Sequence, residues 1–191
     1  MNPQIARLIS NEVCSLYEQY GNDDYIGEPV SQLEHMCQSA QMAEAEGYDD
    51  EVILAAFFHD IGHLCEHIML VGQMDGYGIM DHEILAANFL RDKGFSEKIA
   101  RLVESHVQAK RYLTFKYPDY YNKLSEASKI TLSKQGGIMS DTEAVFFEQD
   151  PLHLLYIKLR EWDDKAKLLN QPLPSLDKYK EIAFRHLLSQ N

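Results

Sequence analysis

The amino-acid sequence predicts an all-α protein, folded as a single compact helical bundle with additional helices toward the C-terminus. Apolar residues recur every three or four positions along most of the 191 residues, which is the period of a helix with one buried face. Two capping boxes, in which a Ser and a Glu three residues later satisfy each other's backbone N–H groups, occur at 31–34 and 140–143. The sequence shows no alternating run of strand length, no internal repeat and no long linker, so we expect one domain over residues 1–191.

The first half of the chain predicts five helices. The first has apolar residues at helical spacing, and each of the other four begins at a Ser or Asp that can cap a helix N-terminus, among them Asp49 and Asp81. Glycines lie at or near the ends of three of these four helices. The predicted helices cover residues 5–17, 31–47, 49–62, 81–94 and 96–115, and a Gly- and Met-rich loop is predicted over residues 71–80.

The second half is less regular but also favours helices. Four aromatic residues and a Pro at 116–122 predict a loop or a bent short helix, and two glycines end a helix predicted over 125–134. The second capping box begins another helix. A longer helix is predicted over 152–169, where two prolines at 171–174 break it, and Ser175 caps the final helix.

Composition limits the classes of function. The chain has 18 Lys and Arg against 30 Asp and Glu, a formal net charge of −12, which argues against a nucleic-acid partner. A small anionic substrate stays open, because a buried metal pair reverses the local field. Three cysteines without a C-x-x-C pair predict neither a disulfide framework nor a zinc knuckle. With no signal peptide and no run of 18 apolar residues, we expect a cytoplasmic protein with no membrane partner.

The most informative feature is His59-Asp60, which follows the apolar run 52–58. Neighbouring side chains on a helix point about 100° apart, so such a pair can hold a metal from two sides. Burial of a His and an Asp is costly unless a metal compensates them, and the two oxygens of Asp60 could bridge two ions. Nitrogen and oxygen donors without thiolates suit Fe, Mn or Zn. The candidate ligands of this dinuclear site are His35, His59, Asp60, His82, His106 and Asp163, with Asp164 as the rival of Asp163.

Two residues lie one helical turn beyond a candidate ligand. His63 follows His59 and Lys110 follows His106 at a spacing of four, so each pair shares a helix face. A donor placed one turn from a ligand can hold an anion against a metal. Taken singly, a His such as His35, His82 or His106 is more often structural than a ligand, whereas the His59-Asp60 pair is evenly balanced between the two roles. A Lys such as Lys110 is more often a solvated helix residue. The histidines without such neighbours are assigned structural roles: His67, His153 and His186.

The order His, His-Asp, Asp on consecutive helices resembles the HD-domain superfamily, and the two further histidines resemble its dinuclear members. The chain is most similar to the HD-domain mixed-valent diiron oxygenases. The run Lys110-Arg111-Tyr112-Leu113-Thr114-Phe115 is the most specific part of this resemblance. The resembling segments are 24–28, 32–35, 55–64, 105–116, 124–129 and 160–164.

The resemblance implies how the ligands divide between two Fe ions in the mixed-valent Fe(II)/Fe(III) state, with O2 as co-substrate. Asp60 would bridge the two ions. One iron would take His35, His59 and Asp163, and the other would take His82 and His106.

The resemblance also implies a reaction. The oxygenase would cleave the carbon–phosphorus bond of 2-amino-1-hydroxyethylphosphonate to give glycine and phosphate, in organophosphonate catabolism, with a hydroxylase that supplies the C1 hydroxyl as pathway partner. Tyr25 would occupy an iron until substrate arrives, and Glu28 would meet the substrate ammonium through a charge-assisted contact. The candidates for the phosphonate oxygens are Lys110, His63, Ser128 and, more weakly, Gln135.

Two alternatives remain at this point. A sister oxygenase acting on 1-hydroxy-2-(trimethylammonio)ethylphosphonate would give glycine betaine, and its pocket would favour aromatic faces, which the tyrosines at 25, 112, 117, 120 and 121 leave open. A metal-dependent HD phosphohydrolase would use the same ligands to activate water.

Overall fold

The computed structural model describes residues 1–25, 27–72, 74 and 79–190, and its regular elements are helices apart from one isolated bridge between Asp24 and Ser31. The all-α fold class is therefore confirmed. The elements are α1 (Pro3–Tyr20), α2 (Gln32–Ala45), α3 (Asp50–Phe58), α4 (Ile61–Leu64), the 3-10 helix η1 (Cys65–His67), α5 (His82–Asp92), α6 (Glu97–Lys116), α7 (Pro118–Lys123), α8 (Glu126–Lys134), α9 (Asp141–Gln149), α10 (His153–Lys165) and α11 (Leu176–Ser189).

The predicted cap residues begin most of these helices. Both capping boxes form, because the Ser31 and Ser140 hydroxyls accept from the backbone N–H three residues later and the Glu side chains reach back. Asp49 accepts from the Val52 N–H at 3.0 Å and so caps α3. Asp81 precedes α5 as expected, but its side chain makes no capping hydrogen bond and its φ is 53°.

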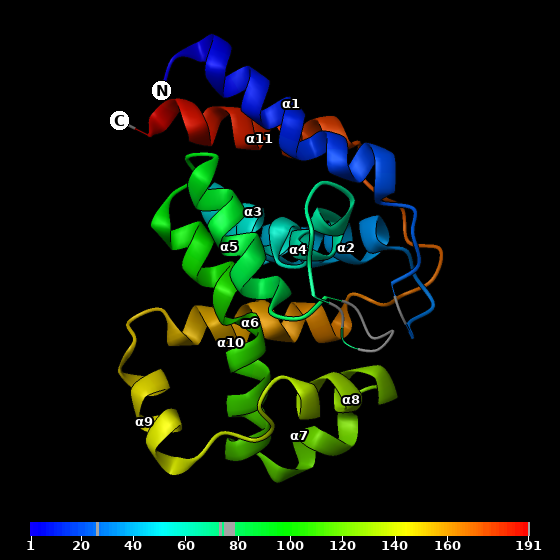
Figure 1. Cartoon of the computed structure of the whole chain (residues 1–191), viewed down its shortest axis with the longest axis vertical. Coiled ribbons are helices and arrows are strands. Elements are labelled where there is room, and N and C mark those ends of the chain that lie inside the picture. Colours follow the sequence, from blue (N-terminus) through cyan, green and yellow to red (C-terminus); the bar gives the residue numbers. More distant parts are fainter. Residues whose placement is uncertain (26, 73, 75–78, 191) are drawn as a thin grey trace.

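The helices pack in layers along the long axis of the molecule. α1 and α11 lie side by side at one end, α7, α8 and α9 gather at the other, and α6 and α10 cross between them (Figure 1). The fully buried Phe57 on α3 stacks on Tyr17 of α1 at 4.4 Å between ring centroids and on Tyr179 of α11 at 4.1 Å. This aromatic stack joins the terminal helices to the central ones, from which the candidate ligands come.

The helix predicted over 49–62 ends earlier than expected. α3 stops at Phe58, residues 59 and 60 form a turn, and α4 starts at Ile61. The His59 ring donates from Nδ1 to the Ala56 carbonyl at 2.8 Å, the same carbonyl that a continuing helix would offer to the Asp60 N–H. The His-Asp pair therefore lies in a turn between two helices.

The helix predicted over 152–169 also ends early, at Lys165. The next carbonyl, that of Ala166, accepts from His35 Nδ1 at 2.9 Å. Leu168 then exchanges two hydrogen bonds of 3.0 Å with the Gln38 amide, donating through its N–H and accepting through its carbonyl. Contacts with α2 replace the last turn that the sequence pattern predicts.

The sequence also predicts local structure at residues 24–28, 71–80 and 116–122. The short helix option at 116–122 is confirmed as α7. The predicted loop over 71–80 and the resembling segment 24–28 lie partly outside the described residues, which exclude 73, 75–78 and 26.

Within the part of the chain that is described, no helix has the length and apolar character needed to cross a membrane.

Candidate metal centre

Five segments bring the six candidate ligands together in the protein interior. α2 supplies His35, the α3–α4 turn supplies the His-Asp pair, α5 begins with His82, α6 carries His106 and α10 carries Asp163. Each of these residues is at most 4% exposed. Charged and polar side chains buried to this degree need compensation, so their convergence marks a site.

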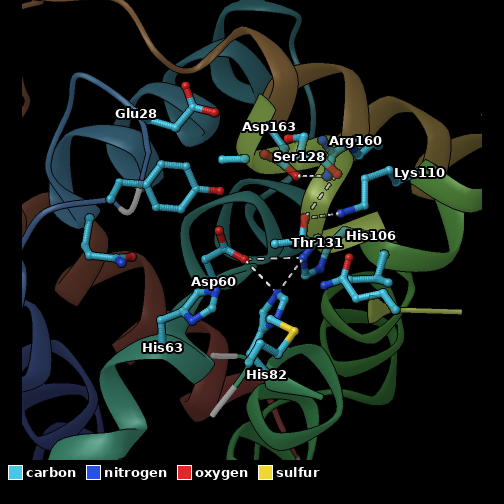
Figure 2. A pocket seen from close by; sticks show the side chains of 16 residues that line it. Glu28, Asp60, His63, His82, His106, Lys110, Ser128, Thr131, Arg160 and Asp163 are labelled. Carbon is cyan, nitrogen blue, oxygen red and sulfur yellow. Dashed lines mark hydrogen bonds and ion pairs between the residues drawn. The ribbon is translucent and has the colours of Figure 1, made fainter. Parts of the chain in front are cut away.

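The four histidines face one another in two pairs. Nε2 of His35 lies 3.0 Å from Nε2 of His59, and Nε2 of His82 lies 3.1 Å from Nε2 of His106. Asp60 lies between the pairs, with Oδ2 at 3.5 and 3.6 Å from the first pair and Oδ1 at 3.2 and 3.3 Å from the second. Figure 2 shows Asp60 with the second pair, His82 and His106. One carboxylate therefore presents one oxygen to each pair, which is the arrangement of a bridging ligand.

The hydrogen bonds of the rings fix which nitrogen carries the proton. Nδ1 of His35, His59 and His106 each donates to a backbone carbonyl, at 2.9, 2.8 and 2.7 Å. The proton on Nδ1 leaves a lone pair on Nε2. Burial lowers the pKa of His59 to about 4, so its ring is neutral at neutral pH. With both rings of the first pair neutral and protonated on Nδ1, two lone pairs face each other at 3.0 Å, an arrangement that a cation between them would stabilise.

The carboxylates lead to the same conclusion. Oδ1 of Asp60 and Oδ1 of Asp163 are buried, and neither has a hydrogen-bond partner among the described residues. Oδ1 of Asp163 lies 3.4 Å from Nε2 of His35, beside the first pair. Donor atoms bound to one metal at about 2.1 Å lie about 3 Å apart, as these atoms do. The residues present therefore fit two metal ions. Every donor atom is a nitrogen or an oxygen, a set that suits Fe, Mn or Zn.

The structure separates Asp163 from its neighbour in sequence. Oδ2 of Asp163 accepts from the Arg160 guanidinium at 2.7 Å, which leaves Oδ1 directed at the histidines. Asp164 instead accepts from the other side of the same guanidinium and from the Tyr120 hydroxyl. Of the two carboxylates that the sequence left open, only Asp163 reaches the cluster.

A small cavity opens beside the Asp60 carboxylate. Its volume is about 60 Å³, which is space for a few water molecules. All six predicted substrate-contacting residues line it: Tyr25, Glu28, His63, Lys110, Ser128 and Gln135. The sequence analysis did not assign three further polar lining residues to the site: Gln32, Thr131 and Arg160.

Two buried cations face this cavity (Figure 2). Lys110 donates from Nζ to the Thr131 hydroxyl at 3.0 Å, and burial with the nearby Arg160 charge lowers its pKa to about 7. The side chain of Arg160 is 4% exposed and held by Asp163 and Asp164. The spacing of these two acids at i+3 and i+4 was the signal that could have identified Arg160 from the sequence.

His63 lies against the second histidine pair. Its ring stacks on His82 with 4.2 Å between ring centroids, and its Nδ1 accepts from the Ile79 N–H at 3.4 Å. Burial lowers the pKa of His63 to about 3, so this ring too is neutral. Ligand atoms of His63, Asp60 and His82 lie within 4.8 Å of one another, so His63 could contact either a metal or a substrate bound to it.

The N-terminal residues Tyr25 and Glu28 occupy different surroundings. Tyr25 stacks on His35 at 4.0 Å, and burial together with the Asp60 carboxylate holds the pKa of its phenol well above the usual value. Glu28, which is predicted to face a substrate ammonium, accepts from Lys167 Nζ and Ser125 Oγ, each at 2.6 Å, and lines the cavity. The sequence analysis did not identify Lys167, because 139 residues separate it from Glu28.

Comparison with known proteins identifies the family of this chain. The HD domain family matches residues 32–146, which include five of the six candidate ligands. The chain belongs to the HD-domain family. The match ends before Asp163, so the structure rather than the family pattern connects that carboxylate to the HD ligands.

Three relatives cover almost the whole HD-domain chain. An uncharacterised protein of Acanthamoeba polyphaga mimivirus is 48% identical over 177 residues, 93% of this chain and 81% of the relative. The [1-hydroxy-2-(trimethylamino)ethyl]phosphonate dioxygenase (glycine-betaine-forming) of Leisingera caerulea is 36% identical over 176 residues, 90% of this chain and 89% of the relative. The hydroxymethylphosphonate dioxygenase of Gimesia maris is 36% identical over 181 residues, 92% and 88% respectively.

Proposed function

We propose that this HD-domain protein is a diiron dioxygenase that cleaves the carbon–phosphorus bond of a 1-hydroxyphosphonate. The observation that carries the proposal is the pair of facing histidine couples bridged by Asp60, beside a small cavity that contains two buried cations. The names of two relatives, both phosphonate dioxygenases, support the reaction class.

The ligands would divide as the resemblance implies. His35, His59 and Asp163 would hold one iron, His82 and His106 the other, and Asp60 would bridge them. The bound iron pair would supply the redox chemistry with O2. A reaction with one O2 balances, because 2-amino-1-hydroxyethylphosphonate plus O2 has the atoms of glycine plus phosphate.

The chain's own residues would bind and orient the substrate. Lys110 and Arg160 place positive charge beside the cavity, and the Ser128 and Thr131 hydroxyls lie with them along its wall, which suits phosphonate oxygens. Oε1 of the Gln135 amide is buried without a hydrogen-bond partner among the described residues and could accept from a substrate hydroxyl. A buried, narrow site also keeps bulk water from the reacting carbon.

As the substrate we propose 2-amino-1-hydroxyethylphosphonate, because the sequence resembles 2-amino-1-hydroxyethylphosphonate dioxygenase (glycine-forming). The Glu28 carboxylate suits a primary ammonium. A trimethylammonium group would favour an aromatic cage, but Tyr25 is the only Tyr, Phe or Trp among the described residues that line the cavity. Tyr112 and Tyr120 bond to Glu148 and Asp164 instead. The glycine-betaine-forming reaction is therefore the alternative.

The test is dioxygen uptake by iron-loaded protein. We would supply 2-amino-1-hydroxyethylphosphonate, its trimethylammonium analogue and hydroxymethylphosphonate in parallel, and quantify O2, phosphate and the organic product. Uptake with equimolar glycine and phosphate supports the proposal, and glycine betaine alone favours the alternative. Phosphate release from nucleotides without O2 would instead indicate a phosphohydrolase. His59→Ala serves as the metal-site control.

A further inference from the structure

An ion pair between two distant parts of the chain holds Glu28, a residue that lines the cavity. Glu28, whose side chain is 9% exposed, accepts at Oε1 from Nζ of Lys167, whose side chain is 15% exposed, at 2.6 Å. The Ser125 hydroxyl donates to the same oxygen at 2.6 Å. No hydrogen bond to Oε2 of Glu28 is found among the described residues. The carboxylate is thus compensated through one oxygen and available through the other.

Lys167 is firmly positioned by its chain neighbours. The Ala166 carbonyl accepts from His35 Nδ1 at 2.9 Å, and Leu168 exchanges two hydrogen bonds with the Gln38 amide. The ammonium of Lys167 also lies 5.8 Å from the centroid of the Tyr25 ring. Because the backbone on both sides of Lys167 is tied to α2, its side chain reaches Glu28 from an anchored base.

The chemistry of this pair bears on substrate choice. A hydroxyphosphonate with an ammonium on C2 offers Glu28 a second cation, and a hydroxyphosphonate without one offers none. In a site from which water is excluded, a carboxylate that already binds one ammonium group binds a second one less strongly. The Lys167 ammonium and the substrate ammonium therefore compete for Glu28. An uncompensated carboxylate, in turn, would repel the anionic phosphonate of a substrate that has no ammonium group.

We propose that Lys167 is a specificity-determining residue that sets the balance between hydroxyphosphonates with and without a cationic group on C2. This inference rests on the proposed function. While Lys167 holds Glu28, the cavity accepts a substrate such as hydroxymethylphosphonate with the ion pair intact. A substrate ammonium must displace the Lys167 ammonium or share the carboxylate with it. Loss of the lysine charge should therefore shift preference toward the amino substrate.

The test compares kcat/KM for 2-amino-1-hydroxyethylphosphonate and hydroxymethylphosphonate in wild type and variants. We expect Lys167→Met to raise the ratio of kcat/KM for the amino substrate to kcat/KM for hydroxymethylphosphonate about tenfold or more, mainly through KM. Lys167→Arg keeps the cation and should hold the ratio within about threefold of wild type. In a Glu28→Gln background, Lys167→Met should leave the ratio unchanged, because the lysine acts through that carboxylate. Lys167→Gln gives a second neutral variant if Met impairs folding.

Lys180→Met is the matched control, because Lys180 has a similar exposure of 18% and pairs with Glu18 at 2.9 Å between α11 and α1, away from the cavity. An unchanged ratio in Lys167→Met with Glu28 present would overturn the inference. Failure of wild type to turn over any hydroxyphosphonate would instead overturn the proposed function. In that case the ratio of the two dissociation constants, measured by calorimetry on metal-loaded protein, would still decide the role of Lys167.

Discussion

Oε2 of Glu83 lies 3.5 Å from Nδ1 of His82, so this candidate ligand faces a carboxylate where the other three face backbone carbonyls. Both side chains are buried, and neither of these atoms has a hydrogen-bond partner among the described residues. A carboxylate stabilises a proton on the near nitrogen and makes the far nitrogen a stronger metal donor. The two metal positions are thus built differently.

The first prediction concerns this carboxylate. Glu83→Gln should lower the affinity of the position held by His82 and His106 by about 10- to 100-fold, because the outer anion is lost. The other position keeps its three ligands and should keep its affinity. Anaerobic titration with Fe(II), followed by metal analysis after desalting, would show one tightly bound ion in place of two.

Glu97→Gln is the control for loss of a carboxylate, since Glu97 is exposed and pairs with Arg91 at 2.8 Å on the surface. It should bind two ions as wild type does. Two ions bound with unchanged affinity in Glu83→Gln would show that the contact between Glu83 and His82 has no influence on the metal.

The second prediction concerns Arg160, whose guanidinium donates to Oδ2 of Asp163 at 2.7 Å inside the protein. Arg160→Leu leaves that buried carboxylate without its cation, which should lower the free energy of unfolding of the metal-free protein by about 3–5 kcal/mol. Urea denaturation measures this loss. Lys158→Met breaks the more exposed pair with Glu46 and should cost at most about 1 kcal/mol. Equal losses in the two variants would contradict the special role of Arg160.

Sequence patterns predicted what depends on neighbours along the chain. Ser31, Asp49 and Ser140 cap helices where expected, because capping involves residues two or three positions apart. Spacing could not separate Asp163 from Asp164, since that choice depends on the hydrogen bonds of one guanidinium.

The same limit applies to the helix ends and to the cavity wall. The helix expected to continue past Lys165 stops because α2 binds its next carbonyl, that of Ala166. The Glu28 and Lys167 pair joins residues 139 positions apart. Neither contact leaves a periodic signal in the sequence, so tertiary structure alone reveals them.

The third prediction concerns Gly62, which lies directly against the backbone of the ligand His82. A Cβ atom at Gly62 would be 2.1 Å from the His82 carbonyl oxygen, closer than any contact permits. Gly62→Ala should therefore push α4 and α5 apart, lower stability by about 1–3 kcal/mol and weaken the second metal position. Thermal melting with and without metal tests this. Gly72→Ala is the control, because among the described residues the nearest atom to its added Cβ, the Cβ of Met80, would be 3.7 Å away.

The fourth prediction is a pH dependence set by Lys110. Burial and the Arg160 charge lower the pKa of Lys110 to about 7, so its ammonium is mostly protonated at pH 6 and mostly neutral at pH 8. A cation binds phosphonate oxygens better than a neutral amine does. Affinity for a phosphonate should therefore fall as pH rises through 7, approaching about tenfold per unit at higher pH.

Lys110→Arg isolates this contribution, because a guanidinium stays protonated across the whole range. The measurement is calorimetry with hydroxymethylphosphonate on metal-loaded protein from pH 6 to pH 9. The dissociation constant should rise less steeply with pH for Lys110→Arg than for wild type. The ionisation of the phosphonate itself affects both proteins equally, so the difference between their slopes reports on Lys110. Identical slopes would mean that Lys110 keeps its proton throughout, and that the phosphonate oxygens are held by a cation whose charge does not change, such as Arg160.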